Sequence, residues 1–108
     1  MALQVAELSV QLIGTLRPLV GRIKARDRSL ADQLTRAASS VALNIAEAQH
    51  SDPGNRRARL FTAAGSANES LMAVRIAVEW RYFGATEAKA ALALLDRILA
   101  ILWKMTRG

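Results

Sequence analysis

Apolar residues recur every three or four positions along almost the whole chain, and no useful length of it alternates between apolar and polar residues as a half-buried strand does. Spacing of this kind places apolar side chains together on one face of a helix. The pattern therefore predicts an all-α protein with helices over residues 2–25, 53–83 and 86–106, and a second helix that begins at Asp27 or Ser29 and ends at about residue 49.

The segments between these helices contain residues that begin and end helices. Ser51 or Asp52 can cap the third helix, with Pro53 at its first position, where a missing amide donor costs nothing. Gly84 is expected to supply the left-handed residue that ends the third helix. Thr86 is expected to cap the fourth helix.

Short connections favour antiparallel packing of consecutive helices. We therefore expect residues 1–108 to form one domain, an antiparallel up-down-up-down four-helix bundle. The third helix carries a second apolar stripe beside the one that a bundle core requires, formed by Met72, Ile76, Trp80 and Phe83. The fourth helix has a similar surplus, formed by Leu94, Ile101 and Trp103. Burial of these faces between copies predicts a homo-oligomer.

Polar residues at helical spacing interrupt the apolar segment QLTRAASSVALNIAE, residues 33–47. Offsets of four, four and three residues put them on one helix face, which antiparallel packing would turn toward the third helix. We expect this face to form a structural polar network that comprises Arg36, Ser40, Asn44, Glu47, Ser66 and Glu69.

The antiparallel register also predicts the partners within this network. Arg36 should lie opposite Glu69 or Ser66, Asn44 should approach Arg59, and Glu47 should approach Arg56 or Arg57. If Arg36 and Glu69 are both buried, removing Glu69 should cost roughly 3–5 kcal/mol, because a buried charge loses its partner.

Cations outnumber acids, with fifteen Lys and Arg against nine Asp and Glu, and twelve of the cations are arginine, which favours bidentate contact with phosphate or carboxylate. Two groups of cations stand near predicted helix ends. The first basic cluster comprises Arg22, Lys24, Arg26 and Arg28. The second basic cluster comprises Arg56, Arg57 and Arg59, and Lys104 and Arg107 should reach the same end of the bundle. A solvated charged surface is the alternative interpretation of either cluster.

The net charge of +6 favours a polyanionic partner, and repetition of the clusters in an oligomer would strengthen contact with a phosphate backbone. Aromatic residues are few, and Trp80 and Trp103 fall on apolar faces, so base stacking is not expected. Recognition of structured RNA through its backbone and shape is the leading hypothesis. The alternative is a protein-interaction scaffold that makes no contact with nucleic acid.

Catalytic, metal and membrane functions find little support in the residues. The chain has no cysteine, its single histidine, His50, stands at a predicted helix end, and the acids form no recognisable metal or paired-acid motif. We therefore expect no enzyme activity, metal or cofactor. Asp96 and Arg97 interrupt the longest apolar run, and the start of the chain does not look like a signal peptide, so a cytoplasmic protein is expected.

The segments QLTRAASSVALNIAEA and GSANES resemble the bacterial four-helix bundle family first noticed as proteins encoded in intervening sequences of 23S ribosomal RNA genes. The matching positions are Gln33, Arg36, Ala37, Ser40, Asn44, Ile45, Ala46, Glu47, Gly65, Ser66 and Glu69. Ala48 departs from the pattern, which usually has glycine there followed by arginine. The resemblance implies a small cytoplasmic bundle, often a homopentamer. The best understood relatives in this family look like accessory proteins of diversity-generating retroelements, which bind RNA and a reverse transcriptase.

Overall fold

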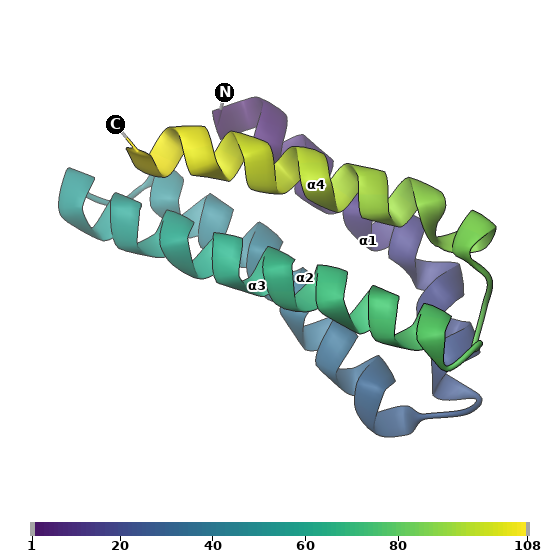
Figure 1. Cartoon of the computed structure of the whole chain (residues 1–108). Helices are drawn as coiled ribbons and strands as arrows, with labels where there is room; N and C mark the ends of the chain where they lie inside the picture. Colours follow the sequence, from purple (N-terminus) through teal and green to yellow (C-terminus); the bar gives the residue numbers. More distant parts are fainter. Residues whose placement is uncertain (1, 108) are drawn as a thin grey trace.

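A computed structural model of the chain describes residues 2–107, which form four helices (Figure 1). They are α1 (Ala2–Lys24), α2 (Arg28–Gln49), α3 (Pro53–Glu79) and α4 (Ala85–Arg107). The described residues contain no strand, so the all-α prediction is confirmed. Residues 1 and 108, the two ends of the expected domain, lie outside the described range.

The four helices lie side by side in an elongated body with principal extents of 42 × 22 × 19 Å (Figure 1). Each helix packs against the next one along the chain, and α4 also packs against α1. At one end, called here the Tyr82 end, the Tyr82 hydroxyl donates a hydrogen bond of 3.2 Å to Asp27 and so joins two connections. At the other, the Pro53 end, Pro53 shares a pocket with Met105 and Thr106 of α4.

Aspartate side chains begin the two middle helices, and each is one of the two alternatives that local sequence offered. Asp27 accepts the amide N–H of Leu30 at 3.0 Å at the start of α2, and Asp52 accepts that of Asn55 at 3.0 Å at the start of α3. Pro53 takes the first helical position, where it has no hydrogen bond to lose.

The core is a single cluster of buried side chains from all four helices. Leucine and isoleucine supply most of its volume from α1 and α4, whereas α3 contributes mainly small residues. Ala63, Ala67 and Ala77 of α3 are fully buried, as is Ser70, whose hydroxyl is satisfied by the carbonyl oxygen of Ser66. Small side chains on this face let α3 approach its neighbours closely.

The predicted end of the third helix is wrong. α3 ends at Glu79, Arg81 has a positive φ of 62°, and the N–H groups of Arg81 and Tyr82 donate to the carbonyl oxygens of Val78 and Ala77. This is a Schellman motif with arginine in the place that glycine usually takes. A helix continued through Phe83 would keep that ring on the exposed stripe, whereas the early turn returns it to the core, where it is 3% exposed.

The start of the fourth helix also differs from the prediction. α4 begins at Ala85, and the carbonyl oxygen of Gly84 accepts the N–H of Ala88. Glu87, three residues after Gly84, reaches back and accepts the Gly84 N–H at 3.0 Å. Glycine has no side-chain acceptor, so this is the Glu87 half of a capping box alone, and Thr86 lies inside the helix instead of capping it.

Replacing Arg81 with glycine is expected to stabilise the protein by about 0.5–1 kcal/mol. A left-handed conformation costs a residue with a Cβ about 1–2 kcal/mol, and the greater freedom of glycine in the unfolded chain offsets part of the gain. Urea denaturation measures the difference. Arg75→Gly, within the helical part of α3, is the matched control and should destabilise by about 0.5–1 kcal/mol. Equal effects of the two substitutions would contradict the role of the backbone angle.

Several large apolar side chains remain on the surface of the described residues. Met72, Ile76 and Trp80 of α3 are exposed, as the second stripe predicted, and Trp80 is 67% exposed. Leu94 and Ile101 of α4 instead pack partly against the core. Trp103 of α4 stays exposed, and α1 exposes Leu3, Val10 and Ile13, so the exposed apolar surface is not confined to α3.

Candidate nucleic-acid interface

Two members of the second basic cluster line a pocket at the Pro53 end. Arg56 and Arg57, in the first turns of α3, line this pocket of about 350 Å³ together with Met105 and Thr106 of α4. Within residues 2–107 no ion pair joins either arginine to an acid. Their guanidinium groups are exposed and available to an anion from solution.

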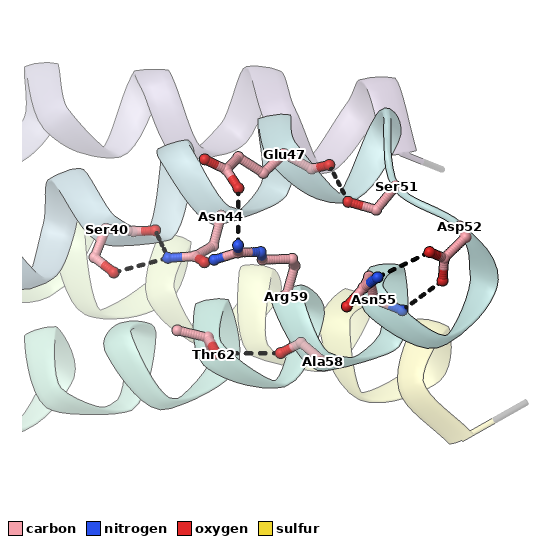
Figure 2. Close-up of polar contacts among 9 residues, drawn as sticks. All are labelled: Ser40, Asn44, Glu47, Ser51, Asp52, Asn55, Ala58, Arg59 and Thr62. Carbon is pink, nitrogen blue, oxygen red and sulfur yellow. Dashed lines mark hydrogen bonds and ion pairs between the residues drawn. The ribbon is translucent and has the colours of Figure 1, made fainter.

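Asp52, the acid that begins α3, is engaged by Asn55. Asn55 donates to the carboxylate through both its backbone N–H at 3.0 Å and its side-chain amide at 2.8 Å (Figure 2). These hydrogen bonds, the backbone one first, lower the pKa of Asp52 below its ordinary value of 3.8. The helix cap therefore stays charged in neutral solution without an ion pair to Arg56 or Arg57.

Arg59, the third member of the cluster, points toward α2. Its guanidinium lies 3.3 Å from the carboxylate of Glu47, and both side chains are about half exposed (Figure 2). An exposed pair of this kind contributes little to stability. The predicted approach of Glu47 to the second basic cluster is correct, but its partner is Arg59 instead of Arg56 or Arg57.

Three short polar side chains of the expected network meet between α2 and α3. The Ser66 hydroxyl donates to that of Ser40 at 2.8 Å, and the Asn44 amide donates to the Ser40 hydroxyl and carbonyl oxygens at 3.0 and 2.9 Å (Figure 2 shows the bonds between Asn44 and Ser40). All three residues are half-buried. Direct contact between two serine side chains requires close backbones, so the network fixes the α2–α3 register.

The expected pairing of Arg36 with Glu69 or Ser66 is not present in residues 2–107. Arg36 and Glu69 are both exposed, no ion pair joins them, and Ser66 bonds to Ser40. The long side chains of Arg36 and Glu69 reach solvent from the edge of the α2–α3 interface, whereas the short serine side chains cannot.

Glu69→Ala is therefore expected to change the free energy of unfolding by less than about 0.5 kcal/mol, as for most exposed substitutions. This small expected change replaces the cost of roughly 3–5 kcal/mol that applies if Arg36 and Glu69 form a buried pair. Thermal unfolding of the variant and the parent at matched concentration measures the effect. Ser66→Ala, which removes the half-buried bond to Ser40, should cost more than Glu69→Ala, and the reverse order would contradict the observed network.

The first basic cluster lies at the Tyr82 end, where acids and an aromatic ring engage part of it. Arg22 forms an ion pair with Glu87, and the guanidinium of Arg26 lies 5.9 Å from the centre of the Tyr82 ring. Lys24 and Arg28 are exposed. Arg22 of the first basic cluster and Arg59 of the second are the members with an ion-pair partner among the described residues, so Arg56 and Arg57 both lack one.

Tyr82 is the single tyrosine of the chain, so its titration can be followed directly. Partial burial raises the pKa of its hydroxyl above the ordinary value of 10.0, and the hydrogen bond to Asp27 and the negative charge of that carboxylate raise it further, whereas Arg26 lowers it. The neutral form is favoured by the fold, so its stabilising contribution is present below pH 10 and is lost as pH rises through the raised pKa.

Ultraviolet titration of the phenolate is expected to give a midpoint above that of free tyrosine. Asp27→Asn should lower the midpoint but not restore it fully, because burial remains. Asparagine also caps helices well, so α2 should keep its start. An unchanged midpoint in Asp27→Asn would show that the carboxylate does not act on Tyr82.

Other kinds of site are not evident in the described part of the chain. Residues 2–107 contain no group of three or more His, Asp or Glu side chains that could hold a metal ion. None of the helices in that range is long and apolar enough to cross a membrane. His50, the single histidine, is the exposed C-cap residue of α2.

Two contacts at the Pro53 end were not foreseen from the sequence. Arg57 lies over the ring of Phe61, and Arg107 lies over the ring of Trp103. Each pair is separated by four residues on one helix, which brings side chains together, so this spacing was the available signal. Trp103 is exposed, although the sequence pattern placed it on an apolar face and argued against base stacking.

The fold and its charged ends define a small, basic, all-helical protein with no strands among its described residues. A family model described as 23S rRNA-intervening sequence protein matches residues 1–104, and the chain belongs to this family. The resemblance found in the second and third helices is thereby confirmed.

A solved structure supports the same fold. The crystal structure of a protein with unknown function from the S23 ribosomal protein family of Bacteroides thetaiotaomicron VPI-5482 is similar, with a TM-score of 0.89. The match covers 96% of this chain and 99% of that chain at 17% sequence identity. No curated protein matches the sequence.

Proposed function

We propose that this protein is a noncatalytic, cytoplasmic, oligomeric helical bundle that binds structured RNA through arginine clusters. It would act as an accessory factor to a reverse transcriptase or an RNA-processing partner. The observation that carries the proposal is the pair Arg56 and Arg57, which line one pocket without an ion-pair partner in residues 2–107. Arginine side chains presented in this way suit phosphate oxygens.

Oligomerisation would multiply this contact. The proposed unit is an up-down-up-down bundle that buries the exposed apolar face of α3 against other copies, and a pentamer is the assembly that the family resemblance implied. Each copy then adds its basic clusters to one assembly, so a modest affinity per copy becomes a strong one. Light scattering should give a mass several times that of one chain.

Fluorescence anisotropy with a labelled structured RNA tests the function. Backbone contact predicts that log K falls linearly with log salt concentration, with a slope of about −0.9 for each phosphate neutralised on a duplex. Binding that is absent at low salt, or that does not change with salt, would overturn the proposal.

A protein-interaction scaffold is the second candidate. It is favoured by a groove of about 450 Å³ between α3 and α4, which is lined by Met72, Ile76, Trp80 and Leu92 among others. Affinity purification with and without nuclease separates the two candidates. Partners that survive nuclease, together with no RNA binding at low salt, would favour the scaffold.

A further inference from the structure

Two arginine guanidinium groups lie over exposed aromatic rings at the Pro53 end. The Cζ atom of Arg57 is 5.6 Å from the centre of the Phe61 ring, and that of Arg107 is 5.3 Å from the centre of the Trp103 ring. Phe61 is 51% exposed and Trp103 is 59% exposed. Each pair therefore has a positive charge over one face of an aromatic ring, while about half of the aromatic residue stays exposed.

Helical spacing puts both rings on the sides of their helices that line the groove between α3 and α4. Met72 and Leu92 line this groove from opposite helices. Phe61 lies eleven residues before Met72, and Trp103 lies eleven residues after Leu92. Eleven residues make close to three helical turns, so each ring is on the same side of its helix as the groove residue. The aromatic pairs therefore lie along the same helix sides, three turns from the groove residues, at the end of the body where Arg56 and Arg57 line their pocket.

The arginines determine which kind of partner fits these rings. No ion pair within residues 2–107 involves Arg57 or Arg107, and an apolar surface placed over the rings would remove water from two unpaired guanidinium groups, which is costly. A nucleotide avoids this desolvation cost, because its base can stack on the ring while its phosphate forms an ion pair with the guanidinium group. Bases also stack on guanidinium planes themselves.

We propose that the Pro53 end binds unpaired nucleotides of RNA, with bases stacked on Phe61 and Trp103 and phosphates held by Arg57 and Arg107. This inference rests on the proposed RNA-binding function and narrows the target from structured RNA in general to RNA with a loop, bulge or single-stranded end. Bases inside a duplex are stacked on one another and cannot reach the rings.

Tryptophan fluorescence tests the stacking directly. The chain has two tryptophans, so Trp80→Phe leaves Trp103 as the reporter, and Trp103→Phe leaves Trp80, near the Tyr82 end, as the matched control. Oligouridine is expected to quench Trp103 and to leave Trp80 unchanged. A blunt-ended RNA duplex of equal charge should quench neither. Quenching of both tryptophans alike, or of neither by oligouridine, would overturn the inference.

Affinity measurements separate this inference from the proposed function. Trp103→Leu keeps an apolar side chain but removes the stacking surface, and should lower oligouridine affinity by about 5- to 150-fold, the range for loss of one stacked base. Phe61→Leu should act in the same direction, whereas Trp80→Leu should not. Duplex affinity should change little in all three variants, and circular dichroism confirms that each remains folded.

The remaining outcomes distinguish failure of the stacking inference from failure of the proposed RNA-binding function. If duplex and oligouridine bind equally well and both tolerate Trp103→Leu, the stacking inference fails while RNA binding stands. If neither RNA binds at low salt, the proposed function fails as well. If Trp103→Leu lowers the mass in solution without affecting RNA affinity, a second copy covers the ring and the inference is wrong.

Discussion

Replacing Arg56, Arg57 and Arg59 with alanine is expected to weaken RNA binding by about tenfold or more at roughly 0.1 M salt, and to reduce the salt slope by about 1 for each phosphate that the variant no longer neutralises. Arg56 and Arg57 carry the effect, because Arg59 is already paired with Glu47. Anisotropy titrations at several salt concentrations measure both quantities.

The triple variant should remain folded. All three side chains are exposed, and cations near the start of α3 face the positive end of the helix dipole, so their removal does not weaken the helix. The Arg59–Glu47 pair is solvent-exposed and contributes little.

A matched control removes the same charge elsewhere. Arg17, Arg75 and Arg97 are exposed and belong to neither basic cluster. Their replacement with alanine lowers the net charge by the same amount and should reduce affinity much less. The variant Lys24→Ala, Arg26→Ala, Arg28→Ala tests the first basic cluster in the same way. Equal losses in all three variants would show that net charge, and not a defined surface, attracts the RNA.

Replacing Ala67 with leucine is expected to destabilise the protein by about 1–3 kcal/mol, because extra methylene groups in a close-packed core force neighbours apart. Ala67 is fully buried on the α3 face that contributes mainly small residues. Separation of α2 from α3 would also strain the hydrogen bond between Ser66 and Ser40. Urea denaturation, with its slope checked for two-state behaviour, measures the change.

Ala58→Leu is the control on the same helix. Ala58 is exposed one turn after the start of α3, so the larger side chain there should leave the unfolding free energy nearly unchanged. A neutral effect of Ala67→Leu would mean that the α3 core face has unfilled space, and would contradict close packing through alanine.

Local sequence predicted a helix boundary correctly where residues next to that boundary determine it. Asp52 and Pro53 begin α3 by contacts within a few residues, and those contacts do not depend on the rest of the fold. The end of α3 depends on Phe83, whose burial against the core compensates for a left-handed Arg81. Burial of that kind is a tertiary effect, so Gly84 looked like the better helix terminator.

Helical spacing placed Ser40 and Ser66 in one polar network, but the predicted register put Ser66 or Glu69 opposite Arg36. In the structure Ser66 bonds to Ser40 instead, because both short side chains lie at the α2–α3 interface. Arg36 and Glu69 have long side chains at the edge of that interface, and hydration competes with pairing there. Spacing also brings Arg107 near Trp103, but only the fold determines that the ring is exposed.

Asp27 does two things at once, since one carboxylate oxygen begins α2 while the other holds Tyr82 in the loop before α4. This carboxylate therefore links the α1–α2 pair to the α3–α4 pair at the Tyr82 end. Residues 50–52 connect α2 to α3 at the Pro53 end, so the two helix pairs are tethered at both ends of the body. Motion of one pair against the other is therefore restrained at the end that carries the surfaces proposed to bind RNA.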